Sequence, residues 1–301
     1  MAVGNMKTIK RRIKSVGSTM QITKAMELVA SSKLRRAKKR EKETRPFFDA
    51  QEKMLHDIYR SHSIETPYAK HRGKVKNSLY IVIAGDKGLA GGYNSNVFKK
   101  VLAVHGEKPW SPKIFAIGKK AVEFFEKRDY NLVDRRMNIA ENIKSGHCTG
   151  IANAAIKQFI DGEVDEVKLF YTKFVSSMVQ ETRVMQLLPL ELPDEYKDEN
   201  ADAVGSAKKG DEKPKRKTEP MYDPTPDAVF NRIIPNFIGG LIQCAITESY
   251  TSELSARQMA MESASDNAEE MIGSLSLLYN RARQEKITNE INEIVGGANA
   301  L

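Results

Sequence analysis

The stretch MESASDNAEEMIGSLSLLYNRA, which spans residues 261–282, decides the fold of this chain. Apolar or small residues recur in it every three or four positions, so the predicted seam consists of Met261, Ala264, Ala268, Met271, Leu275, Leu278 and Ala282. A stripe that repeats about every 3.5 residues is typical of a coiled-coil helix, which cannot bury that stripe alone. The helix is predicted to begin near Asp227 and to run to Val295, where Gly296 and Gly297 would stop it.

The N-terminus carries a second stripe of the same kind. It is predicted to run through Met6, Ile9, Ile13, Val16, Met20 and Thr23 and, after a polar position at Glu27, through Ala30, Leu34 and Ala37. This helix would extend from about Ala2 to about Arg60, with a kink or brief break at Pro46. Two seams at opposite ends of one chain predict that the ends pair, with the middle of the sequence looped out as a separate body.

The last turns of the C-terminal helix do not keep the same seam. The apolar register slips after Ala282 to Ile287, Ile291 and Ile294. A helix whose register breaks cannot hold the same face against the same neighbour. We therefore expect this tip to leave the coiled coil and to extend beyond its partner helix. Polar residues interrupt or flank the apolar positions of the helix at Arg257, Gln284, Thr288 and Glu290.

Between the two long helices, short apolar runs alternate with helical patterns. Strands are predicted at 78–84, 113–117, 132–136, 167–175 and 180–188, and helices at 96–104, 119–127 and 149–160, the last capped near Thr149. This alternation predicts an α/β layer with a largely parallel sheet. Close packing or a bend is expected at Gly239-Gly240. The predicted domains are an N-terminal helix (1–60), an α/β domain (77–192), a charged flexible loop (193–226) and a C-terminal helix (227–301).

The charge of the chain is uneven. Its net charge is +9, yet residues 1–45 contain fourteen Lys or Arg and three Glu. Such a basic end predicts an acidic partner, which could be nucleic acid, anionic lipid or an acidic protein surface. Lys and Arg break the first turns, which argues against a signal peptide, and no apolar run approaches the roughly 20 residues that cross a bilayer. Any membrane association is therefore expected to be peripheral.

A glycine loop at residues 83–94, IAGDKGLAGGYN, follows a predicted strand and precedes a predicted helix. This position is typical of phosphate-binding turns, but the glycine spacing matches neither nucleotide-binding motif. The pattern favours a turn that shapes the sheet edge or a partner surface, and leaves nucleotide binding as a second reading. The five histidines lack metal-ligand spacing and no catalytic motif stands out, so no cofactor, metal or active site is predicted.

Three stretches resemble the gamma subunit of F-type ATP synthases: ITKAMELVASSKLRR (22–36), the glycine loop through Asn96, and YNRARQEKITNEINEIVGGA (279–298). The resemblance implies an antiparallel coiled coil of the end helices with an inserted Rossmann-like α/β domain. It also implies a non-catalytic rotor shaft that turns inside a hexamer of alpha and beta subunits, with its foot against the epsilon subunit and the c-ring. ATP would be made and split on the beta subunits.

The resemblance assigns roles to single residues. Contacts with beta or alpha are implied for Met26, Lys33, Arg35, Arg36, Arg257, Gln284, Thr288 and Glu290. Contacts of the foot with the c-ring or epsilon are implied for Tyr222 and Asp223. The chain would lie peripherally on the cytoplasmic face of a bacterial cell membrane, or be a mature organellar chain, and would bind no nucleic acid.

Two features depart from the family pattern. Ala90 stands where the family commonly has cysteine, and the segment 193–226 is long, charged and free of cysteine, which argues against the disulfide switch of chloroplast members. We hypothesise that this segment is a mobile loop that brakes hydrolysis. Two other readings stay open from the residues alone: a coiled-coil protein whose basic arm binds nucleic acid, and a nucleotide-dependent enzyme that uses the glycine loop.

Overall fold

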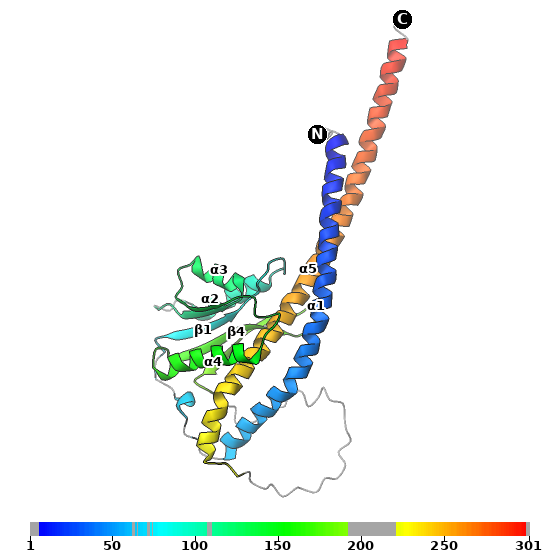
Figure 1. Cartoon of the computed structure of the whole chain (residues 1–301). Coiled ribbons are helices and arrows are strands. Elements are labelled where there is room, and N and C mark those ends of the chain that lie inside the picture. Colours follow the sequence, from blue (N-terminus) through cyan, green and yellow to red (C-terminus); the bar gives the residue numbers. More distant parts are fainter. Residues whose placement is uncertain are drawn as a thin grey trace, which may run out of the picture. The chain divides into compact units, whose positions relative to one another are not determined.

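The computed structural model describes residues 6–61, 64, 66–70, 73, 75–106, 110–191 and 221–298. The chain divides into two compact units. The helical unit comprises residues 1–36, 88–92 and 253–301, and the α/β unit comprises residues 37–87 and 93–252. Two long helices, α1 (Met6–Ser61) and α5 (Pro226–Ala298), each contribute to both units (Figure 1). Most of the charged segment expected at 193–226 lies outside the described residues.

In the helical unit, α1 and α5 form the antiparallel pair that the sequence predicts. Thr23 Oγ1 of α1 lies 2.7 Å from Ser265 Oγ of α5, within hydrogen-bond distance. A Cβ atom placed on Gly17 would lie 4.0 Å from Cδ1 of Ile272. Because Gly17 precedes Thr23 while Ile272 follows Ser265, the two helices run in opposite directions. The expected coiled coil is therefore confirmed.

The seam of α5 differs from the prediction at three positions, since the residue after Ala264, Met271 and Leu278 takes the place of each. Met271 and Leu278 are 45% and 54% exposed, whereas Ile272 and Tyr279 are partly buried. The buried register also includes the polar residue Ser265, whose Oγ donates a hydrogen bond to the carbonyl oxygen of Met261. The seam alternates steps of four and three residues and runs through Met261, Ser265, Ala268, Ile272, Leu275, Tyr279 and Ala282. The seam predicted through Met271 and Leu278 is thus wrong by one position.

The tip of α5 leaves the coiled coil, as predicted. Ala282 is buried, and each residue from Arg283 to Val295 whose burial the structure describes is exposed. The helix nevertheless continues through Gly296 and Gly297 to Ala298, so the predicted stop at the glycines is wrong. A glycine costs a helix only about 1 kcal/mol relative to alanine, and two of them do not force it to end.

Pro46 does not break α1. The helix is continuous from Met6 to Ser61 with Pro46 inside it, so a break there is excluded and the alternative, a kink, stays a prediction. A proline removes one backbone hydrogen bond and crowds the preceding turn. Here the flanking residue Phe48 stacks on Phe237 of α5, with ring centroids 5.4 Å apart, in the core of the α/β unit. Packing of this kind can offset the cost of the proline, because it holds the helix two residues after it.

The α/β unit is built on a five-stranded sheet. Its strands are β1 (Ser78–Ile83), β2 (Lys113–Ile117), β3 (Leu132–Arg136), β4 (Glu166–Phe174) and β5 (Gln180–Leu188), in the order β3-β2-β1-β4-β5. The first four strands are parallel and β5 pairs antiparallel with β4. A short 3₁₀ helix, η1 (Pro67–Ala69), precedes the sheet. The Rossmann-like α/β fold expected from the resemblance is confirmed.

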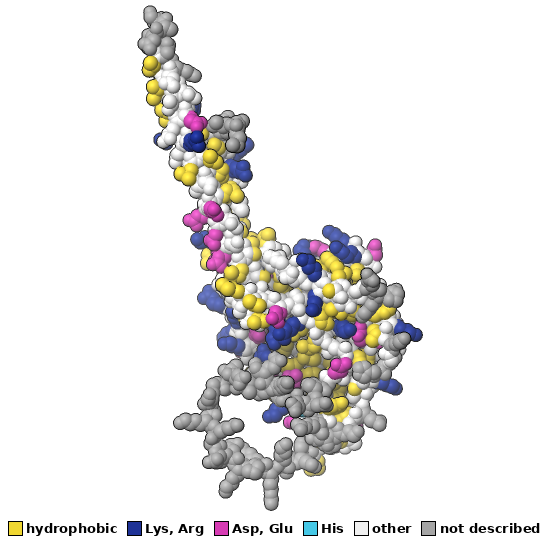
Figure 2. Space-filling view, turned by 180° about the vertical axis from the view of Figure 1, so that it is seen from behind, with side chains coloured by type: hydrophobic (Ala, Val, Ile, Leu, Met, Phe, Trp, Pro, Cys, Tyr) yellow, Lys and Arg dark blue, Asp and Glu magenta, His cyan; other side chains and the backbone are white. Residues whose placement is uncertain are grey.

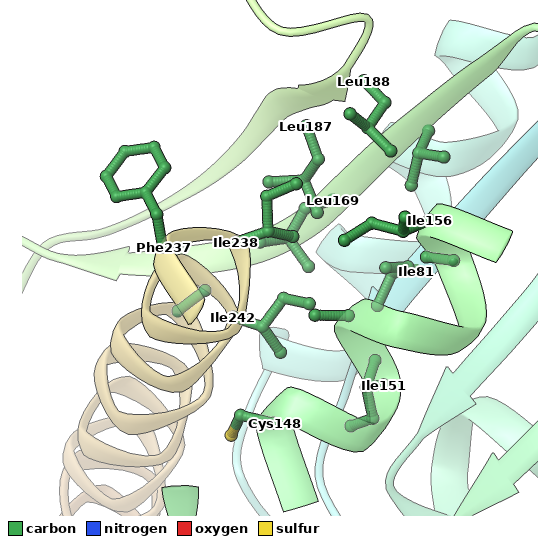
Figure 3. Packing of buried hydrophobic residues seen from close by; sticks show 14 of the residues in the cluster. Ile81, Cys148, Ile151, Ile156, Leu169, Leu187, Leu188, Phe237, Ile238 and Ile242 are labelled. Atoms are coloured by element: carbon green, nitrogen blue, oxygen red, sulfur yellow. The ribbon is translucent and has the colours of Figure 1, made fainter. Parts of the chain in front are cut away.

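Helices cover both faces of this sheet. One face packs against α2 (Tyr93–His105) and α3 (Lys119–Glu126). The other face packs against α4 (Ser145–Ile160) and against the parts of α1 and α5 that belong to this unit. Figure 3 shows side chains from α4, α5 and the sheet meeting in this second core. Every strand of the sheet centre is therefore buried on two sides, which explains its continuous apolar runs.

Two local expectations about the helices of this unit have different outcomes. A Cβ atom on Gly239 would lie 3.3 Å from Cα of Thr149, so the close helix contact expected at Gly239-Gly240 is confirmed. The expected cap at Thr149 is wrong. Helix α4 begins four residues earlier, and Thr149 Oγ1 donates a hydrogen bond to the carbonyl oxygen of Ser145 inside the helix.

Helix α5 is apolar enough to resemble a membrane span. Within Pro226–Asn292 one window has a mean hydropathy of 1.3, and 44% of it is buried. The expectation that no segment of the chain is long and apolar enough to cross a bilayer is therefore wrong. Fully buried residues on one stripe of this helix belong to the core of the α/β unit: Phe230, Ile234, Ile238, Ile242 and Ile246. A helix that is the core of a folded domain meets the same criterion of length and hydropathy.

Candidate partner-binding surfaces

The base of the glycine loop is held by two side chains of the α/β unit. Asp86 Oδ1 accepts hydrogen bonds of 2.9 Å from the backbone N–H groups of Lys119 and Asn138. Asn94 Oδ1 accepts a hydrogen bond of 2.8 Å from the N–H of Gly85. Lys119 is the first residue of α3, so the Asp86 carboxylate occupies the helix end where a bound phosphate would be stabilised. This arrangement favours the structural turn over nucleotide binding.

Gly118 lets β1 and the start of α3 approach closely. Its φ is +96°, and a Cβ atom there would lie 2.0 Å from the carbonyl oxygen of Ala84. The backbone N–H of Lys120 donates a hydrogen bond of 3.0 Å to the carbonyl oxygen of Gly85. These contacts fix the loop at the carboxyl end of the parallel strands, which is where α/β folds usually place their functional residues.

The tip of the glycine loop, residues 88–92, belongs to the helical unit. Arg257 of α5 donates hydrogen bonds to the carbonyl oxygen of Gly88 at 3.2 and 3.3 Å and to Glu253 Oε1 at 2.5 Å. Arg257 is only 8% exposed. Leu89 follows with a φ of +60° and is 63% exposed. The Arg257 side chain therefore does not point into solvent. It holds the backbone next to the exposed, apolar Leu89 in place.

The basic segment of α1 offers a different surface. Met26 and Lys33 are partly buried, whereas Arg35 and Arg36 are exposed. Three large apolar side chains near them are also exposed: Ile22, Leu28 and Val29. Figure 2 shows hydrophobic and basic side chains next to each other along the surface of the helical unit. A surface that combines exposed apolar and cationic groups fits an acidic, partly apolar protein partner better than a purely electrostatic one.

The tip of α5 presents the remaining helical candidates. Gln284, Thr288 and Glu290 are all exposed, and Glu290 Oε1 lies 3.4 Å from Lys286 Nζ of the same helix. Gln284 follows Ser265, the partner of Thr23, by nineteen residues in a continuous helix. At 1.5 Å per residue this places the tip roughly 28 Å along the helix from that contact. The tip and the basic segment are thus two separate surfaces of one unit.

The comparison with known proteins settles the family. A family model described as ATP synthase matches residues 5–301. The ATP synthase gamma chain of Ruminococcus albus is 49% identical over 296 residues, which cover 97% of each chain. This chain belongs to the ATP synthase gamma chain family. The gamma chain of Alkaliphilus metalliredigens is 45% identical over the full length of both chains, and the sodium ion specific gamma chain of Acetobacterium woodii is 40% identical over 99% of each.

Solved structures share the fold. A chain of the Euglena gracilis mitochondrial ATP synthase matches with a TM-score of 0.64 and 18% identity, covering 99% of this chain and 94% of that one. A chain from the central stalk and c-ring of the Tetrahymena thermophila enzyme matches with a TM-score of 0.60 and 23% identity, covering 81% and 99%. The family model and the relatives confirm the resemblance to gamma subunits that the three sequence motifs indicate.

The residues predicted for the foot of this gamma chain lie in the other unit. Tyr222 is partly buried against the core of the α/β unit, and Asp223 is exposed. The structure thus distributes the predicted contact residues over three surfaces, apart from the buried Arg257, and their roles stay predictions. Sequence reasoning missed the partners of Arg257 and the role of Asp86. The spacing of Glu253 and Arg257, four apart in a helix, is the one signal that could have revealed the first of these.

Proposed function

We propose that this chain is the non-catalytic rotor subunit of an F-type ATP synthase. The helical unit is the shaft that turns inside the hexamer of alpha and beta subunits, and the α/β unit lies against the epsilon subunit and the c-ring. This chain would be peripheral to the membrane, which it would approach through this foot. The observation that carries the proposal is the tip of α5, where Ile287, Ile291 and Ile294 are exposed beyond the end of the seam. An apolar stripe of this kind needs a partner to cover it.

The asymmetry of the shaft explains how rotation acts on the beta subunits. Because α5 extends past the paired seam, with its described residues from Arg283 to Val295 exposed, the shaft presents a different side chain at each angle. Each turn would therefore push successive beta subunits through different conformations. The exposed Arg35 and Arg36 would meet acidic groups through screened contacts of roughly 0–1 kcal/mol each. Contacts this weak can be made and broken during every turn.

A non-catalytic role agrees with the chemistry of the α/β unit. The Asp86 carboxylate satisfies the backbone donors at the start of α3 that a phosphate would otherwise engage. Its negative charge there would repel a nucleotide phosphate. ATP synthesis and hydrolysis are accordingly assigned to the beta subunits, and ion flow through the membrane ring drives the shaft.

Purification of the native complex tests the assignment. A tagged chain is expected to bring down alpha and beta subunits in excess over itself. Recovery of the chain alone, or with DNA, would refute the rotor function. A sharper test is Met26→Lys in a reconstituted complex, with Met26→Leu as the matched control. The added charge on the partly buried Met26 is expected to leave hydrolysis active but to reduce its coupling to ion transport, whereas Met26→Leu keeps both.

A further inference from the structure

Two acidic residues of the α/β unit, Glu41 on α1 and Glu248 on α5, lie near enough for the charge of Glu41 to act on Glu248. Glu41 is partly buried on α1, and the Glu248 side chain on α5 is only 15% exposed. Arg45, one turn after Glu41, places its Nη1 3.9 Å from Glu248 Oε1. That distance is longer than a hydrogen bond. In the described part of the chain it is the only ion pair or hydrogen bond that the structure records for Glu248.

The other titratable groups that act on Glu248, on Glu41 or on the neighbouring thiol of Cys244 come from four elements. Lys38, Lys42 and Asp49 accompany Glu41 and Arg45 on α1, Cys244 precedes Glu248 by one turn on α5, and Lys173 and Arg183 lie on β4 and β5. Several of these cations have partners of their own. Arg183 donates hydrogen bonds to Glu181, and the Lys38 ammonium lies 4.6 Å from the Phe174 ring centroid. The surrounding cations therefore neutralise the two carboxylates only in part, and burial keeps water from solvating them fully.

Burial is the dominant influence on both acids. It raises the pKa of Glu248 to about 6, with the Glu41 charge adding to the effect and Lys173, Arg45 and Arg183 opposing it. Burial also raises the pKa of Glu41, against the opposing charges of Arg45, Lys38 and Lys42. A buried carboxyl beside a like charge holds its proton more tightly than a solvated one.

We propose that Glu41 and Glu248 form a proton-operated latch between α1 and α5, which tightens the packing of the two helices under mildly acidic conditions. Uptake of one proton by the pair removes the repulsion between the carboxylates and part of the cost of burying Glu248. Arg45, which is 38% exposed at its side chain, stays solvated when its partner becomes neutral. The latch does not depend on the proposed rotor function. Only the effect of the latch on a turning shaft depends on that function.

The direction of the pH dependence follows from the raised pKa. The folded pKa of Glu248 lies above its ordinary value of 4.5, so the stabilisation is complete below that value and is lost as pH rises through about 6. A change from 4.5 to about 6 corresponds to a folding equilibrium up to about thirtyfold more favourable for the protonated form. Screening by solvent and by the opposing cations makes this an upper bound.

Unfolding of the full chain by urea, measured from pH 4.5 to 7.5, tests the latch. Glu248→Gln imitates the protonated form, so this variant is expected to be more stable than the parent at pH 7.5, by up to about thirtyfold in the folding equilibrium, and equal to it at pH 4.5. Glu41→Gln is expected to change stability in the same direction with a smaller amplitude, because it removes only the like charge.

Glu163→Gln is the matched control with the opposite sign. Lys113 Nζ donates a hydrogen bond of 2.7 Å to Glu163, and this partner lowers the pKa of that carboxyl. Glu163→Gln is therefore expected to be less stable than the parent at pH 7.5 and to lose the difference as pH falls. A Glu248→Gln difference that stays constant with pH would overturn the latch.

A direct titration separates the latch from any general effect of the substitution. The carboxyl carbon of Glu248, followed by NMR in the full chain, is expected to titrate near pH 6 in the parent and at lower pH in Glu41→Gln. A midpoint at or below the ordinary value of 4.5 in the parent would also overturn the proposal. Neither measurement involves the alpha or beta subunits, so a failed latch and a failed rotor assignment give different results.

Discussion

Gly118 shows how one residue determines the geometry of the glycine loop. Its positive φ is favoured only by glycine, and a Cβ atom would overlap the carbonyl oxygen of Ala84, which belongs to the backbone and cannot swing away. We expect Gly118→Ala to lower the free energy of unfolding by about 3 kcal/mol or more, measured by urea denaturation. Gly150→Ala is the control, since nothing lies within 4 Å of a Cβ there and α4 would gain about 0.5–1 kcal/mol. Equal effects of the two substitutions would contradict this account of Gly118.

At the scale of the elements, the spacing of apolar residues predicted the bounds of helices and strands better than the identity of single residues did. Strands β2, β3 and β5 begin and end where the sequence places them, because short apolar or alternating runs between polar residues have few other solutions. The seam of α5 was misplaced because Met271-Ile272 and Leu277-Leu278-Tyr279 offer adjacent apolar residues, and spacing alone cannot choose between them. The partners of Asp86 were not predictable, since Lys119 and Asn138 are brought to it only by the folded sheet.

The corrected seam has a direct test in two neighbouring residues. Ile272 faces Gly17 of α1, whereas Met271 is 45% exposed. We expect Ile272→Lys to destabilise the chain by about 2–4 kcal/mol, because it places a charge against the partner helix. Met271→Lys is expected to change stability by less than about 0.5 kcal/mol. Urea denaturation of the isolated chain measures both, and the reverse order of effects would restore the seam predicted from apolar spacing.

At the scale of the whole molecule, α1 and α5 serve two purposes at once. The part of α5 from Phe230 to Ile246 is the core of the α/β unit, and the part from Met261 to Ala282 is one half of the coiled coil. Each long helix therefore joins the two units without an intervening loop. In a rotor, such continuous helices would carry torque between the foot and the shaft through backbone hydrogen bonds, which are stiffer than a flexible connection.

Truncation of the exposed tip of α5 can distinguish the residues that stabilise the chain from those that contact a partner. We expect a chain that ends after Ala282 to be as stable as the parent within about 0.5 kcal/mol, since the residues it loses are exposed wherever the structure describes their burial. A chain that ends after Ser274 is the control. It also loses the partly buried Leu275 and Tyr279 and should be less stable by about 2 kcal/mol or more.

In the reconstituted complex, the chain that ends after Ala282 should assemble but deliver less torque, because only a partner can make use of an apolar stripe that its own chain leaves uncovered. Full torque from that truncated shaft would mean that the tip is not a contact of the rotor, and the stripe through Ile287, Ile291 and Ile294 would then need another occupant.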